Sequence, residues 1–133
     1  MSTMLQWATN VDAEDIARSI AAARVALGLA LVAAPRLLMR CALKDSEPSG
    51  EAVAALRMAG GRDLALGVGG LLAARRDPAA LRGWVEGGVL ADAIDVPSVA
   101  AAGSLRPAVR VFGTASATAA AALGGLTARR LGR

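Results

Sequence analysis

The chain has no histidine, a single cysteine and few aromatic side chains, and each shortage excludes a class of site. Without histidine, the common zinc sites, Ser-His-Asp triads and histidine general bases are excluded. The one cysteine, Cys41, allows neither an internal disulfide nor a thiolate metal cluster. Aromatic residues make up 2% of the chain, although hydrophobic residues make up 55%. The apolar residues are therefore mainly Ala, Leu, Val and Gly, and small residues let membrane helices approach closely.

Features of nucleic-acid and cofactor binding are missing as well. The net charge is +4, but the basic residues are scattered singly or in pairs and form no stripe. The glycine-rich runs 60–63 and 67–70 follow no strand and lack the Lys-Ser/Thr pair of a phosphate loop. We therefore predict no nucleic-acid partner, no cofactor and no metal site. Residues 1–20 contain acidic side chains where a signal peptide needs basic ones, so we expect any membrane segment to be retained.

Four helical segments are predicted in a single domain covering residues 1–133, at about 13–40, 51–75, 78–102 and 107–130. Asp12 is predicted to cap the first segment, and Asp77 with Pro78 to start the third. Pro35 should kink or shorten the first segment. At about 1.5 Å per residue, each segment can cross a bilayer core of about 30 Å. Because the connecting loops are short, the sequence predicts an all-α fold, a four-helix up-down-up-down transmembrane bundle.

The membrane prediction has an open alternative. Only residues 111–128 form an uncharged run of about 18 residues, the length typical of a transmembrane helix. A soluble or peripheral helical bundle therefore stays open as an interpretation. Hydrophobic residues on all sides of the segments favour the membrane.

The distribution of basic residues predicts the orientation of the bundle. More arginines lie near the segment ends on the side of both termini and of the loop at Asp77 than on the opposite side. By the positive-inside rule, both termini are then cytoplasmic in a multi-pass protein of the cell membrane, a bacterial inner membrane. Trp7 and Trp84 fall on the same side, at the depth where indole rings anchor in a membrane interface.

Charged residues also lie inside the apolar segments, where ionised side chains persist only if they pair, contact water or perform a task. They are Arg24, Arg57, Arg62, Asp63, Asp92 and Asp95. Counting from the segment ends places four of them near mid-depth, and Arg57 and Asp95 together nearer the outer face. At mid-depth, we predict that Arg62 or Arg24 pairs with one of the carboxylates Asp63 and Asp92. Nearer the outer face, Arg57 is predicted to pair with Asp95.

Small residues accompany these carboxylates on two predicted helix faces. Asp92 and Asp95 are three residues apart and therefore share one face. Glycines extend this face, and also the face of segment 51–75 that carries Asp63, so that neighbouring helices can come close. The predicted helix-packing positions are Gly60, Gly67, Gly70 and Gly88.

The charged cluster has two interpretations. In the first, its ion pairs fix the register of the helices, and losing one partner costs about 3–5 kcal/mol. In the second, the charges line a polar cavity that binds or moves something, because intramembrane charges are commonly functional. Both interpretations stay open at this point.

Three stretches of the sequence resemble a known group of proteins. They are residues 24–35 (RVALGLALVAAP), 61–67 (GRDLALG) and 91–95 (ADAID). Together they resemble a set of small bacterial four-helix integral membrane proteins catalogued as a domain of unknown function, over about residues 18–102. The resemblance implies a membrane location and no established activity.

The sequence favours a non-enzymatic role, as a binding, transport-accessory or complex-stabilising component of the membrane. Its partners would be the lipid bilayer and a membrane protein or a second copy of the chain. The alternative is a metal-dependent membrane enzyme that acts on a phosphorylated lipid precursor, with Asp63, Asp92 and Asp95 as Mg²⁺ ligands. Against it, the neighbouring arginines compete with a metal ion for the same carboxylates.

Overall fold

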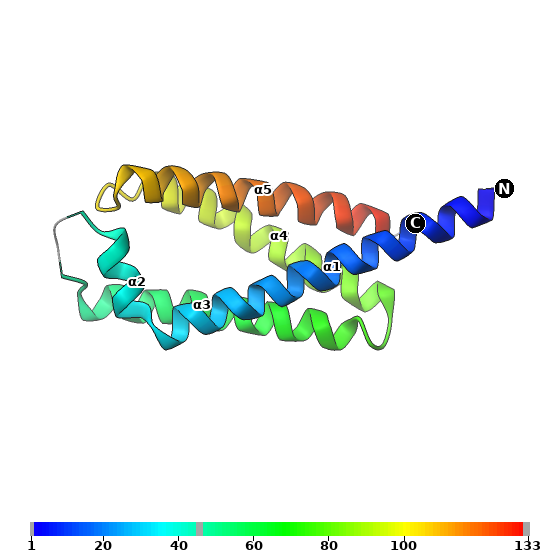
Figure 1. The fold of residues 1–133 in the computed structure, drawn as a ribbon, viewed down its shortest axis with the longest axis horizontal. Coiled ribbons are helices and arrows are strands. Elements are labelled where there is room, and N and C mark those ends of the chain that lie inside the picture. Colours follow the sequence, from blue (N-terminus) through cyan, green and yellow to red (C-terminus); the bar gives the residue numbers. More distant parts are fainter. Residues whose placement is uncertain (1, 45–46, 132–133) are drawn as a thin grey trace.

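The computed structural model describes residues 2–44 and 47–131, and within them every regular element is a helix. The helices are α1 (Ser2–Ala33), α2 (Pro35–Ala42), α3 (Gly50–Ala73), α4 (Pro78–Ala100) and α5 (Pro107–Leu131) (Figure 1). An isolated antiparallel bridge between Leu43 and Leu105 is the sole β-type pairing in the described part of the chain. The predicted all-α fold is confirmed.

The first helix differs from its prediction at both ends. It begins at Ser2 and ends at Ala33, whereas the predicted segment spans about 13–40. Asp12 lies inside the helix, so its predicted role as an N-cap is wrong. The helix continues upstream because residues 4–8 include Met, Leu, Gln and Ala, which are good helix formers, and no Gly or Pro interrupts them.

Pro35 ends α1 and starts α2. A proline disfavours helical geometry at the residue before it, and Ala34 has φ −128° and ψ 45°. Pro35 itself occupies the first turn of α2, where its missing N–H breaks no hydrogen bond. The predicted shortening at Pro35 is therefore observed, and residues 35–42 form a separate short helix across one end of the molecule (Figure 1).

Helices α3 and α4 start at capping residues that can be read from the sequence. Ser49 accepts a hydrogen bond from Ala52 N at 3.2 Å, and Asp77 accepts one from Ala79 N at 3.0 Å. Pro78 is the first residue of α4, as the Asp77-Pro78 pair predicts. The short helix α2 is joined to the α4–α5 loop, because Arg106 Nε donates to Leu43 O at 2.8 Å.

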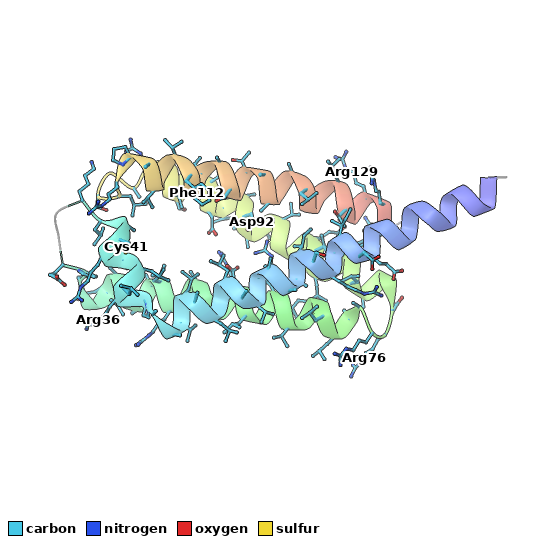
Figure 2. All side chains as sticks on the ribbon, viewed as in Figure 1. Arg36, Cys41, Arg76, Asp92, Phe112 and Arg129 are labelled. Carbon is cyan, nitrogen blue, oxygen red and sulfur yellow. The ribbon has the colours of Figure 1, made fainter. Side chains whose placement is uncertain are left out.

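The long helices pack as two close pairs. Helix α1 packs mainly against α3, and α4 mainly against α5, while α3 with α4 and α1 with α5 form the smaller interfaces. Successive long helices run in opposite directions along the long axis (Figure 1). The α2 end of the molecule carries Arg36, and the opposite end carries Arg76 and Arg129 (Figure 2).

Most of the buried apolar side chains are small, while many large apolar side chains lie on the surface. The cluster of buried apolar residues consists of Ala17, Ala73, Ala128, Leu81 and Val85. Large apolar side chains are instead exposed on all five helices, and Phe112 on α5 is 76% exposed. Two helical stretches, Ala13–Ala33 and Pro107–Leu131, are long and apolar enough to cross a membrane. Only 17% of the most apolar window in each of them is buried against the rest of the protein.

Candidate functional site

Arg24 on α1 connects three helices through its guanidinium group. Its Nη1 donates to Asp63 Oδ1 on α3 at 3.1 Å, and its Nη2 donates to Asp92 Oδ2 on α4 at 2.5 Å. The side chains of Arg24, Asp63 and Asp92 are 12%, 6% and 10% exposed. A planar guanidinium can satisfy two carboxylates at once, and this one joins α1 to α3 and to α4.

A second arginine continues the network toward the protein surface. Arg62 makes a bidentate pair with Asp95, with Nη1 at 2.9 Å from Oδ1 and Nη2 at 2.7 Å from Oδ2. The same Nη2 lies 3.4 Å from Asp63 Oδ1, so Asp63 is shared between the two arginines. Arg62 and Asp95 are about one third exposed. We call the five residues Arg24, Arg62, Asp63, Asp92 and Asp95 the ion-pair network.

The network contains one of the predicted pairings and excludes the other. Arg24 pairs with both Asp63 and Asp92, which are the carboxylates expected at mid-depth. The pairing of Arg57 with Asp95 is wrong, because Arg62 occupies both oxygens of Asp95. Five residues on a helix correspond to a rotation of about 140° beyond one full turn, so Arg57 and Arg62 cannot both face α4. Arg57 is exposed on α3 and pairs with no carboxylate among the residues that the structure describes.

Three predicted glycines lie where α3 meets α1. A Cβ on Gly60 would come within 2.8 Å of Leu31 Cβ, and one on Gly67 within 2.6 Å of Ala21 O. Gly70 is less tight, since its Cβ would lie 3.1 Å from Ala21 Cβ. These positions let the two backbones approach, which brings Arg24 within reach of Asp63.

Gly88 has a different role from the predicted one. A Cβ at this position would lie 2.8 Å from Arg24 Nη2, so the missing side chain makes room for the guanidinium group rather than for another helix. The prediction did not include Gly28 on α1, whose Cβ would lie 2.6 Å from Gly60 O. The sequence signal that could have identified Gly28 as a packing position is its place among large apolar residues in the stretch 24–35.

A cavity of about 330 Å³ lies beside the network. Arg24, Asp63, Asp92 and Asp95 form its polar wall. Its remaining lining comes from α1, α4 and α5: Ile20, Ala23, Leu27, Val99, Ser116, Ala117, Ala120 and Leu123. The contribution of α5 could not be predicted, because its small residues carry no charge or motif. In Figure 2, Asp92 is labelled on α4.

The chemistry available at this site is ion pairing and hydrogen bonding. Within residues 2–44 and 47–131, no three His, Cys, Asp or Glu side chains are arranged to hold a metal ion. Each of the three aspartates instead accepts hydrogen bonds from arginine. Asp63 and Asp92 each use one carboxylate oxygen for these bonds, and no described residue donates to the second oxygen.

Comparison of the chain with protein-family models, with curated proteins and with solved structures found no match in any of the three. The resemblance to four-helix membrane proteins therefore stays a prediction. A function must therefore be inferred from the ion-pair network, the cavity and the exposed apolar surface.

Proposed function

We propose that the chain is an integral membrane protein, a four-helix up-down-up-down bundle in which α1, α3, α4 and α5 span the bilayer. The observation that carries this proposal is the inverted distribution of polarity. Asp63 and Asp92 are buried, while Phe112, Leu90 and Met58 are all more than 60% exposed. Lipid solvates apolar side chains and excludes ions, so this distribution suits a bilayer and is unfavourable in water.

The lengths of the helices support the same proposal. Helices α3 and α4 have 24 and 23 residues, and each therefore extends about 35 Å at 1.5 Å per residue. This length covers a hydrocarbon core of about 30 Å. Three carboxylates within them, those of Asp63, Asp92 and Asp95, are paired within the protein, which lowers the cost of placing them in lipid. Arg57 of α3 is exposed and is a charge that this pairing does not cover. The soluble bundle would instead leave its large apolar side chains in water.

The proposed orientation places both termini in the cytoplasm of a bacterial cell. Arg76 and Arg129 lie at the end of the molecule that carries the termini (Figure 2). Arginines near the ends of transmembrane helices are retained on the cytoplasmic side. Trp84 is 41% exposed, and its position early in α4 suits an interfacial anchor on that side.

Within the membrane we propose a non-enzymatic binding role, as a transport-accessory or complex-stabilising component. The cavity beside the ion-pair network supports this role, because binding sites combine apolar walls with a few convergent polar groups. The alternative of a metal-dependent enzyme gains no support, since the three carboxylates that would be its ligands are each paired with an arginine, which competes with a metal ion.

Membrane extraction tests the location. The expressed chain should sediment with membranes, resist extraction by alkaline carbonate, and dissolve in dodecyl maltoside. Recovery in the supernatant without detergent would overturn the proposal. Release by carbonate alone would also overturn it, because it would identify a peripheral protein.

A further inference from the structure

The charges beside the cavity do not sum to zero. The ion-pair network contains the two cations Arg24 and Arg62 and the three carboxylates of Asp63, Asp92 and Asp95. With every group ionised, one negative charge is left over. Arg57 does not supply the missing positive charge, because it is exposed on another face of α3. An uncompensated charge in an apolar surrounding is costly, so the network favours one further positive charge.

Two carboxylate oxygens are available to receive it. Asp63 Oδ2 and Asp92 Oδ1 accept no hydrogen bond from any described residue, and both aspartates line the cavity. Arg62 Nε is the one fully buried side-chain nitrogen or oxygen without a partner in the described part of the chain. Because the two partnerless oxygens of Asp63 and Asp92 do not belong to this class, they are not fully buried. They are free acceptors on two of the aspartates that line the cavity and that carry the excess negative charge.

Apart from Ser116, the rest of the cavity lining is apolar. Ile20 and Leu27 of α1, Val99 of α4 and Leu123 of α5 line it together with the carboxylates. Its volume of about 330 Å³ lies within the range of small-molecule sites. A bare or hydrated inorganic cation would leave this apolar surface uncovered. A cation that carries a hydrocarbon group would pair with the carboxylates and also cover the apolar walls.

From the charge excess, the free carboxylate oxygens and the apolar walls, we infer that the cavity binds a lipophilic primary ammonium ion. The ammonium N–H groups donate to Asp63 and Asp92, and the hydrocarbon part lies among the apolar side chains. The inference rests on the proposed binding role of the cavity and names its ligand class.

Binding of a matched series of eight-carbon ligands tests the inference. Radiolabelled octylammonium, octanol and octanoate are equilibrated with the full chain in phosphatidylcholine nanodiscs, and the binding to empty nanodiscs is subtracted. Phosphatidylcholine is chosen because its headgroup has no N–H donor. Octylammonium should bind saturably at one site per chain, and the neutral and anionic ligands should not.

Variants with opposite expected effects separate ligand recognition from folding. Asp92→Asn removes the excess negative charge and should weaken octylammonium binding by about tenfold or more. Arg62→Gln increases the negative charge and should strengthen binding, although it also removes an ion pair. Glu86→Gln is the matched control on α4, because Glu86 pairs with Arg82 on the surface, and it should leave binding unchanged. A purely structural network would give no gain for Arg62→Gln.

A variant that fills the cavity keeps the inference testable if Asp92→Asn fails to fold. Ala120→Phe leaves the ion-pair network in place, adds volume to the wall on α5 and should abolish saturable binding. Saturable binding of octanol or octanoate that Ala120→Phe abolishes would overturn the ligand class while retaining the binding role. The absence of saturable binding for all three ligands would overturn the inference. Membrane extraction tests the location separately in either case.

Discussion

Arg24 links the helices of the ion-pair network, because it pairs with two buried carboxylates on different helices. Replacing it by leucine leaves Asp63 and Asp92 without this partner, and we expect a loss of about 3–5 kcal/mol in unfolding free energy. Arg18→Leu is the matched control on the same helix, since its ion pairs with Glu14 and Asp15 are on the surface. The control should change stability by less than about 1 kcal/mol.

Unfolding in mixed micelles of dodecyl maltoside and sodium dodecyl sulfate measures both free energies. Equal stabilities of the two leucine variants would show that the Arg24 pairs are not needed. The triple replacement of Arg24, Asp63 and Asp92 by leucine removes all three buried charges together. It should be more stable than Arg24→Leu alone, because no unpaired ion is left in the interior.

Gly88 gives a second prediction at the residue scale, because it faces the Arg24 guanidinium. The methyl group of Gly88→Ala would displace that guanidinium from Asp63 and Asp92, and we expect a destabilisation of about 1–3 kcal/mol relative to Gly87→Ala. The neighbouring Gly87→Ala is the control, since its Cβ meets only Leu66 Cδ2 at an ordinary 3.5 Å. Thermal unfolding in detergent compares the two variants. A Gly88→Ala protein as stable as Gly87→Ala would contradict the packing of Arg24 against this position.

At the scale of the elements, the contact between α1 and α3 depends on Gly67. Gly67→Ala places a methyl group against the Ala21 carbonyl, which is backbone and can yield only if the helices separate. The midpoint of thermal unfolding should fall. Gly61→Ala on the same helix meets nothing within 4 Å and should raise the midpoint slightly, because alanine favours the helix. The same change in both variants would exclude a special role for the close approach at Gly67.

Most helix ends could be predicted from prolines and capping residues in the sequence. The packing of the helices against one another could be predicted only in part. Pro35, Asp77 with Pro78, and Pro107 mark observed helix ends, because each acts on the local backbone. The start of α1 was missed because Asp12 is a good cap that the preceding helix formers override. The prediction of ion pairs used depth along the helices but not rotation around them. It therefore placed Arg57 where Arg62 lies.

The cavity could not be predicted from the sequence. Its volume depends on the separation of α1 from α5, and small residues such as Ala117 and Ala120 do not indicate that separation. The polar wall was easier to identify, since charged residues in apolar segments are conspicuous at any packing geometry. The sequence therefore predicted the residues that could carry chemistry, and the structure added the space beside them.

At the scale of the whole molecule, the single cysteine reports the orientation. Cys41 is exposed on α2, at the end opposite the termini (Figure 2). In intact cells, a membrane-impermeant maleimide should label Cys41 from outside. In a Cys41→Ser background, Arg76→Cys should be labelled only after the membrane is permeabilised. The reverse pattern would place the termini outside, and labelling of both sites in intact cells would contradict a spanning bundle.

The strong polar links are unevenly distributed around the bundle. Among the described residues, the ion pairs that cross between long helices join α1, α3 and α4, and none joins α1 to α5. The seam between α1 and α5 also borders the cavity and is held by side-chain packing. Rocking of α5 away from α1 therefore breaks no ionic bond. In the proposed transmembrane arrangement, an amphiphile dissolved among the acyl chains would therefore reach the carboxylates through this seam, without passing through water at either end.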